Sequence, residues 1–270
     1  MQEQKNRKVA LVTGASEGLG SELAAIHAER SGDLVLVARR KERLEELACK
    51  LSSSHGAKCE IIAMDLAREG AAQELFDKVK EKGIKVDYLI NNAGVGGQGF
   101  FHERALEDDM RLMALNMVTP TLLCKLFLRE FVARGSGRIL IVSSTAALLP
   151  GPLQATYYAS KAYLTSLGDA VWQELQGSGV TMTTLMPGGM DTGFARASGL
   201  EGTKLARSMS FAPRVVAEDG YNAMMRGDME VISKLTMFQM ILLRLSRCLP
   251  KRLVMRQVFE MQKNSASERH

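Results

Sequence analysis

The segment Val9–Gly20 reads VALVTGASEGLG, an apolar run followed by a glycine-rich turn that opens an amphipathic pattern. Glycine lets the backbone bend sharply and lets a bound group approach the main chain closely. The start of the following helix then offers free N–H groups to an anion. A strand, this glycine spacing and a helix together predict a loop that binds the phosphates of a dinucleotide. The contacts expected from this loop are Gly14, Ser16, Gly18, Leu19 and Gly20.

Further short runs of aliphatic and β-branched residues follow this first strand. Longer segments with helical periodicity, such as Leu19–Arg30 and Lys41–Leu51, separate them. Apolar strands that alternate with amphipathic helices are typical of a parallel sheet covered on both faces. We predict a single α/β domain, a Rossmann-type doubly wound parallel sheet of about seven strands with helices on both faces. The predicted strands are Val9–Val12, Leu34–Val37, Cys59–Met64, Tyr88–Ile90, Arg138–Val142, Val180–Leu185 and Glu230–Ile232.

The composition and the charge distribution agree with one globular body. Hydrophobic residues make up 46% of the 270 residues and charged residues 24%, as in ordinary soluble proteins. The net charge of +5 is located between Val231 and Met261, where the sequence has six basic residues and one acidic residue, Glu260. A basic face spread over the fold, as nucleic-acid binding would need, is therefore not indicated. We predict a dinucleotide-binding catalytic domain over residues 1–233 and a basic, apolar, helical C-terminal extension over 234–270.

The cysteines and histidines show no spacing typical of a metal site or a redox pair. The four cysteines form no CxxC motif, so we expect buried free thiols. The polar N-terminus lacks the apolar core of a signal peptide, which favours a reducing, cytoplasmic location. No metal is expected. The residues concerned are Cys49, Cys59, Cys124 and Cys248, and His27, His55, His102 and His270.

The end of the second strand indicates which dinucleotide is bound. An acidic residue at this place would hydrogen bond the ribose 2′-hydroxyl of NAD. Here the strand ends in Arg39 and Arg40, and a guanidinium can hold a 2′-phosphate with paired hydrogen bonds. We therefore predict NADP(H), with Arg39 as the primary contact. The alternative is that one of the two arginines only solvates the start of the next helix.

Tyr157 is the one tyrosine that has a lysine four residues later, Lys161. On a helix these side chains share a face. An adjacent ammonium stabilises a phenolate and lowers the phenol pKa from its usual value near ~10. The preceding strand ends in Ser143 and Ser144, where parallel strands place ligand contacts. A serine there can donate a hydrogen bond to a substrate carbonyl, or it can simply cap the next turn.

With these motifs in order, the first 230 or so residues resemble the classical short-chain dehydrogenase/reductase family. Thr13–Gly20 matches its glycine motif, and Ser144, Tyr157 and Lys161 match its catalytic residues, with Asn116 completing the tetrad. The resemblance implies further cofactor contacts at Asp65 and Leu66 near the adenine, at Asn92, Ala93 and Gly94 after the fourth strand, and at Pro187, Gly188 and Thr192 around the nicotinamide.

The resemblance also implies a role for each catalytic residue. Ser144 orients the substrate carbonyl, and Tyr157 is the acid in reduction or the base in oxidation. Lys161 holds the nicotinamide ribose and lowers the pKa of Tyr157. Asn116 holds a proton-relay water, and its alternative, a backbone contact inside a helix, is compatible with that role. The cofactor supplies the hydride.

Two C-terminal stretches bear on the substrate and on partners. Phe194, Leu200, Leu205, Met209 and Phe211 are apolar, which favours a lid over a lipophilic substrate or ordinary helix packing. The segment Leu235–Phe259 is basic and apolar, and Pro250 divides it. Its first part, Leu235–Leu249, is too short and too charged to span a bilayer. A peripheral membrane contact and a cover of the pocket or a subunit contact remain open.

The function predicted is an NADPH-dependent reduction of a lipophilic ketone, such as a 3-oxoacyl or steroid-like ketone, to an alcohol. Two alternatives stay open: an alcohol or hydroxysteroid dehydrogenase that runs oxidatively, and a non-catalytic NADP(H)-binding regulatory protein. The partner is a small carbonyl or alcohol substrate. The resemblance suggests a homodimer or homotetramer formed through the helices around Leu106–Val132 and Tyr157–Leu175.

Overall fold

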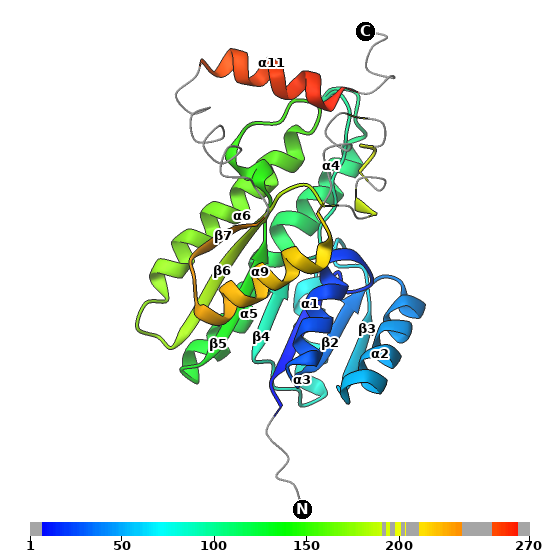
Figure 1. Cartoon of the computed structure of the whole chain (residues 1–270), viewed down its shortest axis with the longest axis vertical. Helices are drawn as coiled ribbons and strands as arrows, with labels where there is room; N and C mark the ends of the chain where they lie inside the picture. Colours follow the sequence, from blue (N-terminus) through cyan, green and yellow to red (C-terminus); the bar gives the residue numbers. More distant parts are fainter. Residues whose placement is uncertain are drawn as a thin grey trace, which may run out of the picture.

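A seven-stranded parallel sheet forms the centre of the molecule (Figure 1). The computed structural model describes residues 7–190, 193, 194, 198–200, 203, 211–233 and 250–263. Adjacent strands follow the order β3-β2-β1-β4-β5-β6-β7, and every pair is parallel. The predicted doubly wound sheet is thus confirmed. The strands are β1 Val9–Thr13, β2 Asp33–Ala38, β3 Cys59–Ala63, β4 Tyr88–Asn91, β5 Gly137–Val142, β6 Val180–Pro187 and β7 Glu230–Ser233.

Side chains of each strand alternate between two apolar layers, because successive residues of a strand point to opposite faces. In β1, Val12 packs in one layer and Leu11 in the other. In β5, Leu140 and Ile139 divide in the same way. Both faces of the sheet are therefore buried. This explains why the strands read as continuous apolar runs with no polar face.

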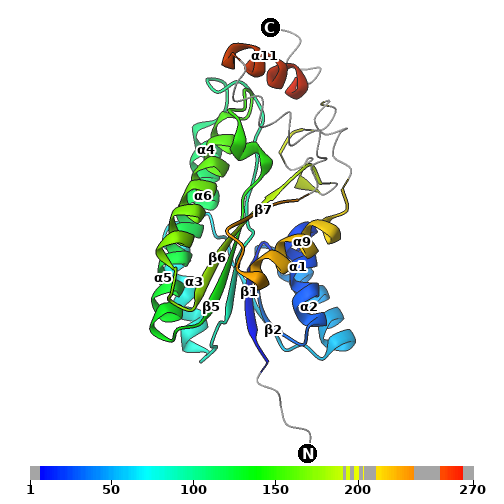
Figure 2. The ribbon, with the colours of Figure 1, turned by 60° about the vertical axis from the view of Figure 1, so that its left-hand side comes forward.

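Helices cover the two faces in separate groups, which Figure 2 shows edge-on. Helices α1, α2 and α9 pack on the face that includes Val12, through Leu23, Leu44 and Tyr221. Helices α3, α5 and α6 pack on the opposite face, through residues such as Phe127. The bounds are α1 Gly18–Glu29, α2 Lys41–His55 and α9 Pro213–Arg226, and α3 Ala71–Glu81, α5 Thr119–Ala133 and α6 Ala155–Glu174.

One long helical rod runs from Leu106 to Ala133 and joins α4, a π-helical turn η1 and α5. It is long and apolar enough to cross a membrane, yet 44% of its most apolar window is buried inside the protein. Its outer side leaves apolar residues such as Val118 and Leu122 exposed. The bounds of the first two parts are α4 Leu106–Met113 and η1 Ala114–Val118.

The sheet changes its direction of winding between β1 and β4. From β1 the chain adds β2 and β3 on one side, whereas β4 is followed by β5, β6 and β7 on the other. The loops that leave the carboxyl ends of these two strands therefore diverge. A crevice forms at such a switch point, and ligands of open α/β sheets bind there.

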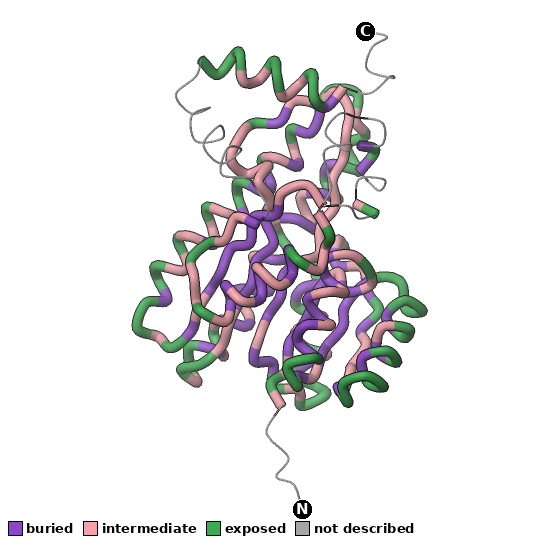
Figure 3. Tube along the Cα trace, viewed as in Figure 1, coloured by how far each residue is buried: buried purple, intermediate pink, exposed green. Residues whose placement is uncertain are grey.

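Figure 3 shows which parts of the chain are buried, and the cysteines differ from one another in this respect. Cys124 is buried in the core, but Cys49 is exposed and Cys59 is half-buried. The expectation of buried thiols is wrong for Cys49, because the buried stripe of α2 passes through Leu44, Ala48 and Leu51 and leaves position 49 facing solvent. Cys248 lies outside the described residues.

A C-terminal helix, α11, lies at the end of the molecule where the strands finish (Figure 1). It spans Lys251–Gln262 and begins directly after Pro250, as expected for a residue that favours the first turn of a helix. Its last residue, Gln262, is buried against the rest of the protein. Residues 234–249, which belong to the predicted extension, lie outside the described residues.

Candidate active site

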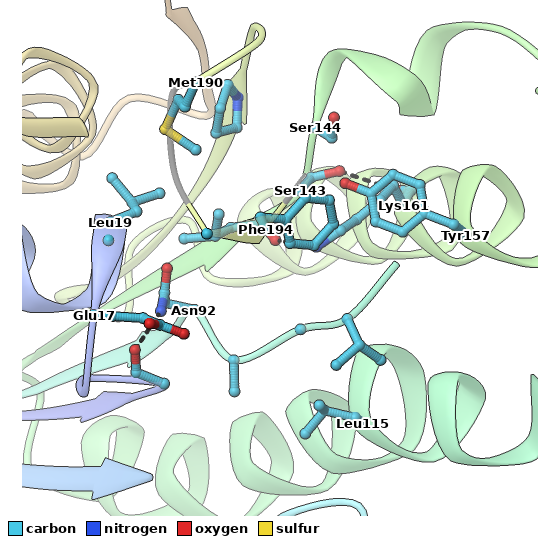
Figure 4. Close-up of a pocket in the computed structure, with 18 of the residues that line it drawn as sticks. Glu17, Leu19, Asn92, Leu115, Ser143, Ser144, Tyr157, Lys161, Met190 and Phe194 are labelled. Atoms are coloured by element: carbon cyan, nitrogen blue, oxygen red, sulfur yellow. Dashed lines mark hydrogen bonds between the residues drawn. The ribbon is translucent and has the colours of Figure 1, made fainter. Parts of the chain in front are cut away.

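A cavity of about 340 Å³ opens at the carboxyl ends of the strands. Its walls come from the loops after β1, β2, β3, β4, β5 and β6, and from α6. Glu17 and Asn92 lie on one side of the cavity, and Ser144, Tyr157 and Phe194 lie on the other (Figure 4). The structure thus brings most of the predicted nucleotide contacts and three of the four predicted catalytic residues, Ser144, Tyr157 and Lys161, into one site.

The glycine loop uses its glycines in two different ways. Gly14 and Gly18 have φ values of 66° and 59°, a left-handed conformation that side chains disfavour. Gly20 has another purpose: a Cβ atom there would lie 2.2 Å from the carbonyl oxygen of Gly14. Gly20 is buried and does not line the cavity, whereas Gly14, Ser16, Gly18 and Leu19 do. Gly20 therefore closes the loop rather than facing a ligand.

Asn92 fastens the glycine loop to the end of β4. Its Nδ2 donates to the carbonyl oxygens of Thr13 at 2.9 Å and Gly14 at 3.2 Å. In return, the Thr13 hydroxyl accepts from the backbone N–H groups of Asn92 and Ala93, each at 3.0 Å. These four hydrogen bonds fix the two loops on either side of the crevice. Ala93 and Gly94 then line the cavity beside them.

The two arginines after β2 differ in their contacts. Arg40 pairs with Glu17 of the glycine loop at 2.8 Å and donates to the Ser16 hydroxyl at 3.2 Å. Arg39 is exposed, lines the cavity, and makes no ion pair or hydrogen bond with any described residue. Arg40 is thereby engaged in holding the loop. Arg39 keeps its guanidinium available to an anion.

Asp65 and Leu66, after β3, line the same end of the cavity. Arg111 of α4 donates to both carboxylate oxygens of Asp65, at 3.0 and 2.8 Å. Burial acts to raise the pKa of Asp65, but the Ala67 amide and Arg111 outweigh it and lower the pKa. The carboxylate is therefore charged and held in place. Its ion pair reduces the repulsion that it would exert on a nearby phosphate.

Ser144 and Tyr157 meet at the opposite end, from the end of β5 and the first turn of α6. Ser144 caps the 3-10 helix η2, Thr145–Leu148, by accepting from the Ala146 N–H at 3.1 Å. Its side chain also acts to lower the pKa of Tyr157, and both residues line the cavity. The cap considered for Ser144 is thus present, and the residue also lines the cavity, where a substrate contact stays a prediction.

Lys161 lies one turn after Tyr157 and is 5% exposed. Its Nζ donates to the carbonyl oxygen of Val142 at 2.9 Å, and it lies 5.8 Å from the centre of the Tyr157 ring. Gly94 passes close by, since a Cβ atom there would be 3.5 Å from the Lys161 Nζ. The lysine is therefore held between the end of β5 and the loop after β4.

Asn116 is fully buried in η1 and does not line the cavity. Its Oδ1 accepts from the Val95 N–H at 2.9 Å, and its Nδ2 donates to the Val95 carbonyl at 2.8 Å and the Ser160 hydroxyl at 3.1 Å. The π-helical turn carries this residue inward, and such turns are frequent at functional sites. In this structure Asn116 positions the loop after β4, which is the backbone contact named as its alternative.

Burial changes the acid–base properties of the catalytic pair. It raises the pKa of Tyr157 to about 12, against the opposing hydrogen bond with Ser144, and it lowers the pKa of Lys161 to about 8. The expected lowering of the Tyr157 pKa by Lys161 is therefore not found. The reason is geometric, because the ammonium group points to Val142. At neutral pH the phenol keeps its proton.

The remaining predicted contacts divide between described and undescribed residues. Pro187 and Gly188 line the cavity after β6, whereas Thr192 lies outside the described residues, as do Leu205 and Met209 of the expected lid. The apolar wall near Tyr157 includes Phe194, whose ring centre is 5.6 Å from that of Tyr157. Met190 and Leu200 also line the cavity.

Several site residues were missed by reasoning from the sequence alone: Glu17, Arg111, Gln154 and Tyr158. Glu17 and Arg111 act on other predicted residues through ion pairs, and neither belongs to a recognisable motif. Gln154 and Tyr158 line the cavity. Gln154 precedes Tyr157 by three residues, a spacing that places two residues on one helix face. That spacing was the signal available for it.

Comparison with known proteins agrees with this geometry. Residues 8–201 match the family model of the short chain dehydrogenases. The chain belongs to the short-chain dehydrogenase family. A short chain dehydrogenase from Pseudocercospora fijiensis is 31% identical over 193 residues, which cover 71% of this chain and 62% of that protein. The ketoacyl reductase HetN of Nostoc sp. is 31% identical over 226 residues, which cover 83% and 78%.

Solved structures of short-chain dehydrogenases extend the comparison. A short-chain dehydrogenase from Sphingobium yanoikuyae in complex with NADPH superposes with a TM-score of 0.79 at 28% identity, over 89% of this chain and 94% of that one. A member from Burkholderia phymatum in complex with NAD gives 0.80 at 25% identity, over 89% and 93%. Members with this fold therefore bind a nicotinamide dinucleotide of either kind.

Replacing Lys161 by Met should stabilise the protein. The Lys161 ammonium has a pKa of about 8 in the folded protein, well below its ordinary 10.5, so its burial costs up to about 3 kcal/mol below pH 8. The lost hydrogen bond to Val142 offsets about 1 kcal/mol of this. We expect Lys161→Met to raise the free energy of unfolding by ~1–2 kcal/mol at pH 7, measured by urea denaturation.

The pH dependence gives the control for this prediction. The free energy of unfolding of the wild type should rise as the pH rises from about 8 toward 10. In this range Lys161 has lost its proton in the folded protein but keeps it in the unfolded chain. The Lys161→Met variant should lack this gain. A variant that is less stable than wild type across this range would show that the buried ammonium is well compensated.

Proposed function

We propose that the protein is an NADPH-dependent oxidoreductase that reduces a carbonyl group to an alcohol by hydride transfer, with Tyr157 as the proton donor. One observation carries this proposal: the hydroxyl groups of Ser144 and Tyr157 lie on the wall of one cavity, and Ser144 is near enough to Tyr157 to act on its pKa. A carbonyl oxygen placed against two such hydroxyl groups would accept hydrogen bonds from both. Donors aimed at an oxygen that gains charge stabilise the transition state.

The residues of the cavity fit a nicotinamide dinucleotide. The left-handed glycines Gly14 and Gly18 present main chain where a side chain would intrude, and α1 begins there with free N–H groups suited to phosphate. When bound, the cofactor supplies the hydride. The Lys161 ammonium lies close to Gly94 and Tyr157, where it can donate to a ribose hydroxyl.

The protonation state of Tyr157 favours the reductive direction. Because burial raises the pKa of Tyr157 to about 12, the phenol is protonated at neutral pH and ready to act as an acid. A proton passes from the Tyr157 hydroxyl to the carbonyl oxygen as the carbon accepts the hydride. Ser144 donates a hydrogen bond to the same oxygen and orients it. Lys161 is charged below about pH 8 and donates to the Val142 carbonyl beside the Tyr157 ring.

The arginines after β2 support NADPH as the cofactor. Arg39 is the exposed guanidinium on the cavity wall with no partner among the described residues, and Arg40 braces the glycine loop through Glu17. No carboxylate stands at the end of β2 to repel a 2′-phosphate. Arg39 would bind that phosphate with paired, charge-assisted hydrogen bonds.

The apolar wall around the catalytic pair supports a lipophilic ketone as substrate. Phe194 lies beside Tyr157, and Met190 and Leu200 also line the cavity. Burial of apolar substrate surface against such side chains stabilises a complex by roughly 25 cal/mol per Å². A ketoacyl reductase, HetN, stands among the relatives in agreement with a carbonyl substrate.

Removal of the Tyr157 hydroxyl tests the chemical step. Tyr157→Phe should lower kcat for ketone reduction by at least ~100-fold, since general acid catalysis contributes about this much or more, and should leave NADPH binding in place. The rate is followed by the loss of reduced-nicotinamide absorbance. Tyr163→Phe, an exposed tyrosine on the same helix, is the matched control. Full turnover by Tyr157→Phe would exclude the assigned mechanism.

Removal of the Arg39 guanidinium tests the cofactor. Arg39→Ala should raise the KM for NADPH by roughly 10-fold to 100-fold, because a charge-assisted hydrogen bond is lost, and should leave the KM for NADH unchanged. Arg43→Ala provides the control, since Arg43 pairs with Glu46 on the outer face of α2. An unchanged preference for NADPH would place the 2′-phosphate contact on another residue.

A further inference from the structure

The end of the C-terminal helix α11 reaches the substrate end of the cavity through a chain of side-chain amides. Gln262, the last residue of α11, is 1% exposed. Its Oε1 accepts from the Gln154 Nε2 at 2.6 Å, and its Nε2 donates to the Tyr158 hydroxyl at 3.0 Å. Gln98 donates to its backbone carbonyl. Residues far apart in the sequence therefore converge on one buried glutamine.

Gln154 is the member of this cluster with an unmet hydrogen-bonding group. Its side chain is 2% exposed and lines the cavity, yet its Oε1 has no hydrogen-bond partner among the described residues. A buried amide oxygen without a partner is destabilising and rare in folded proteins. Because the Nε2 end is taken by Gln262, the oxygen end is the one left for a ligand.

The backbone around Gln154 is arranged to hold this orientation. Leu153, directly before it, adopts a left-handed φ of 64° although it is a buried leucine, and strained positions of this kind cluster at functional sites. The Leu153 carbonyl accepts from the Gly99 N–H at 2.9 Å. Gln154 is the N-cap residue of α6, three residues before Tyr157, roughly 5 Å along the helix axis.

We propose that Gln154 accepts a hydrogen bond from a hydroxyl group of the substrate, at a point removed from the reacting carbonyl, and that Gln262 is the positioning residue that orients the Gln154 amide. This inference rests on the proposed carbonyl reduction. The carbonyl is held by Ser144 and Tyr157, so Gln154 contacts a second polar group. The substrate class is a lipophilic ketone that carries a hydroxyl group roughly 5 Å from its carbonyl, which is the separation of Gln154 and Tyr157 along the axis of α6.

The apolar cavity wall around Gln154 explains why one polar contact would determine which ketones are reduced. Phe194, beside Tyr157, and Leu200 line the cavity with apolar surface, which by itself would not distinguish one apolar chain from another of similar size. A site built to hydrogen bond a hydroxyl rejects the analogue that lacks it, because the buried protein group is then left unpaired. A hydroxyl also both donates and accepts, so it can pair with the free end of the amide in either orientation.

The test uses methyl ketones of graded chain length, each with and without a terminal hydroxyl group. With wild-type protein and NADPH, kcat/KM at the best chain length should favour the hydroxylated ketone by at least ~10-fold over its parent. Gln154→Leu should abolish this preference by lowering kcat/KM for the hydroxylated ketone alone. Gln173→Leu, an exposed glutamine on α6, should retain the preference.

Variants of Gln262 separate positioning from a structural role. Gln262→Met removes the acceptor for the Gln154 Nε2 and should reduce the preference for the hydroxylated ketone. Gln262→Glu keeps an acceptor at this place and should restore it. Gln257→Met, an exposed position on α11, should behave as wild type. A merely structural role would lower turnover of both ketones of a pair equally and leave their ratio unchanged.

Two outcomes overturn the inference, and they differ. If wild type reduces ketones with no preference for a hydroxyl group, and Gln154→Leu leaves the ratio unchanged, the inference is wrong and the proposed carbonyl reduction stands. If wild type binds NADPH but reduces no ketone of the panel, the proposed function fails and the inference fails with it.

Discussion

The hydrogen bonds from the Asn92 amide to the Thr13 and Gly14 carbonyls hold the whole site together. They join the loops after β1 and β4, where the sheet changes its direction of winding. Such a crevice would otherwise be lined by two independent loops, and loops are the most mobile parts of a fold. With Asn92 in place, the glycine loop and the loop after β4 keep fixed positions relative to one another. The cavity is therefore preorganised for a dinucleotide.

The catalytic end depends on a different constraint, the burial of polar groups. Burial raises the pKa of Tyr157 and lowers that of Lys161, so each group moves away from the charge it would carry in water. Neither the buried Tyr157 hydroxyl nor the buried Lys161 ammonium is expected in a site that serves stability alone, because burying such groups costs free energy. Here burial leaves a phenol that holds its proton at neutral pH, as the proposed carbonyl reduction requires. The same low-polarity surroundings would strengthen each hydrogen bond made to a substrate oxygen.

The fold and the core of the site were accessible from the sequence because they depend on short-range patterns. Apolar runs, the glycine spacing of Val9–Gly20 and the four-residue interval between Tyr157 and Lys161 are local signals. Contacts between distant residues leave no such signal: Arg111 reaches Asp65 across 46 residues, and Gln262 reaches Gln154 across 108. The pKa of Tyr157 was expected to fall, and the opposite holds, because the orientation of Lys161 depends on the Val142 carbonyl and not on helical spacing. Cys49 faces solvent for an equally local reason, its place beside the buried stripe of α2.

The proposed function requires a hydride to pass directly from the cofactor to a carbonyl carbon while Tyr157 supplies a proton to its oxygen. Transfer is followed with NADPH that carries deuterium on the transferable position of the nicotinamide ring, and the alcohol product is analysed by mass spectrometry and NMR. We expect one deuterium on the carbinol carbon, and none at that carbon when unlabelled NADPH is used in deuterated water. Deuterium entering this carbon from the solvent, or a product without label from deuterated NADPH, would contradict it.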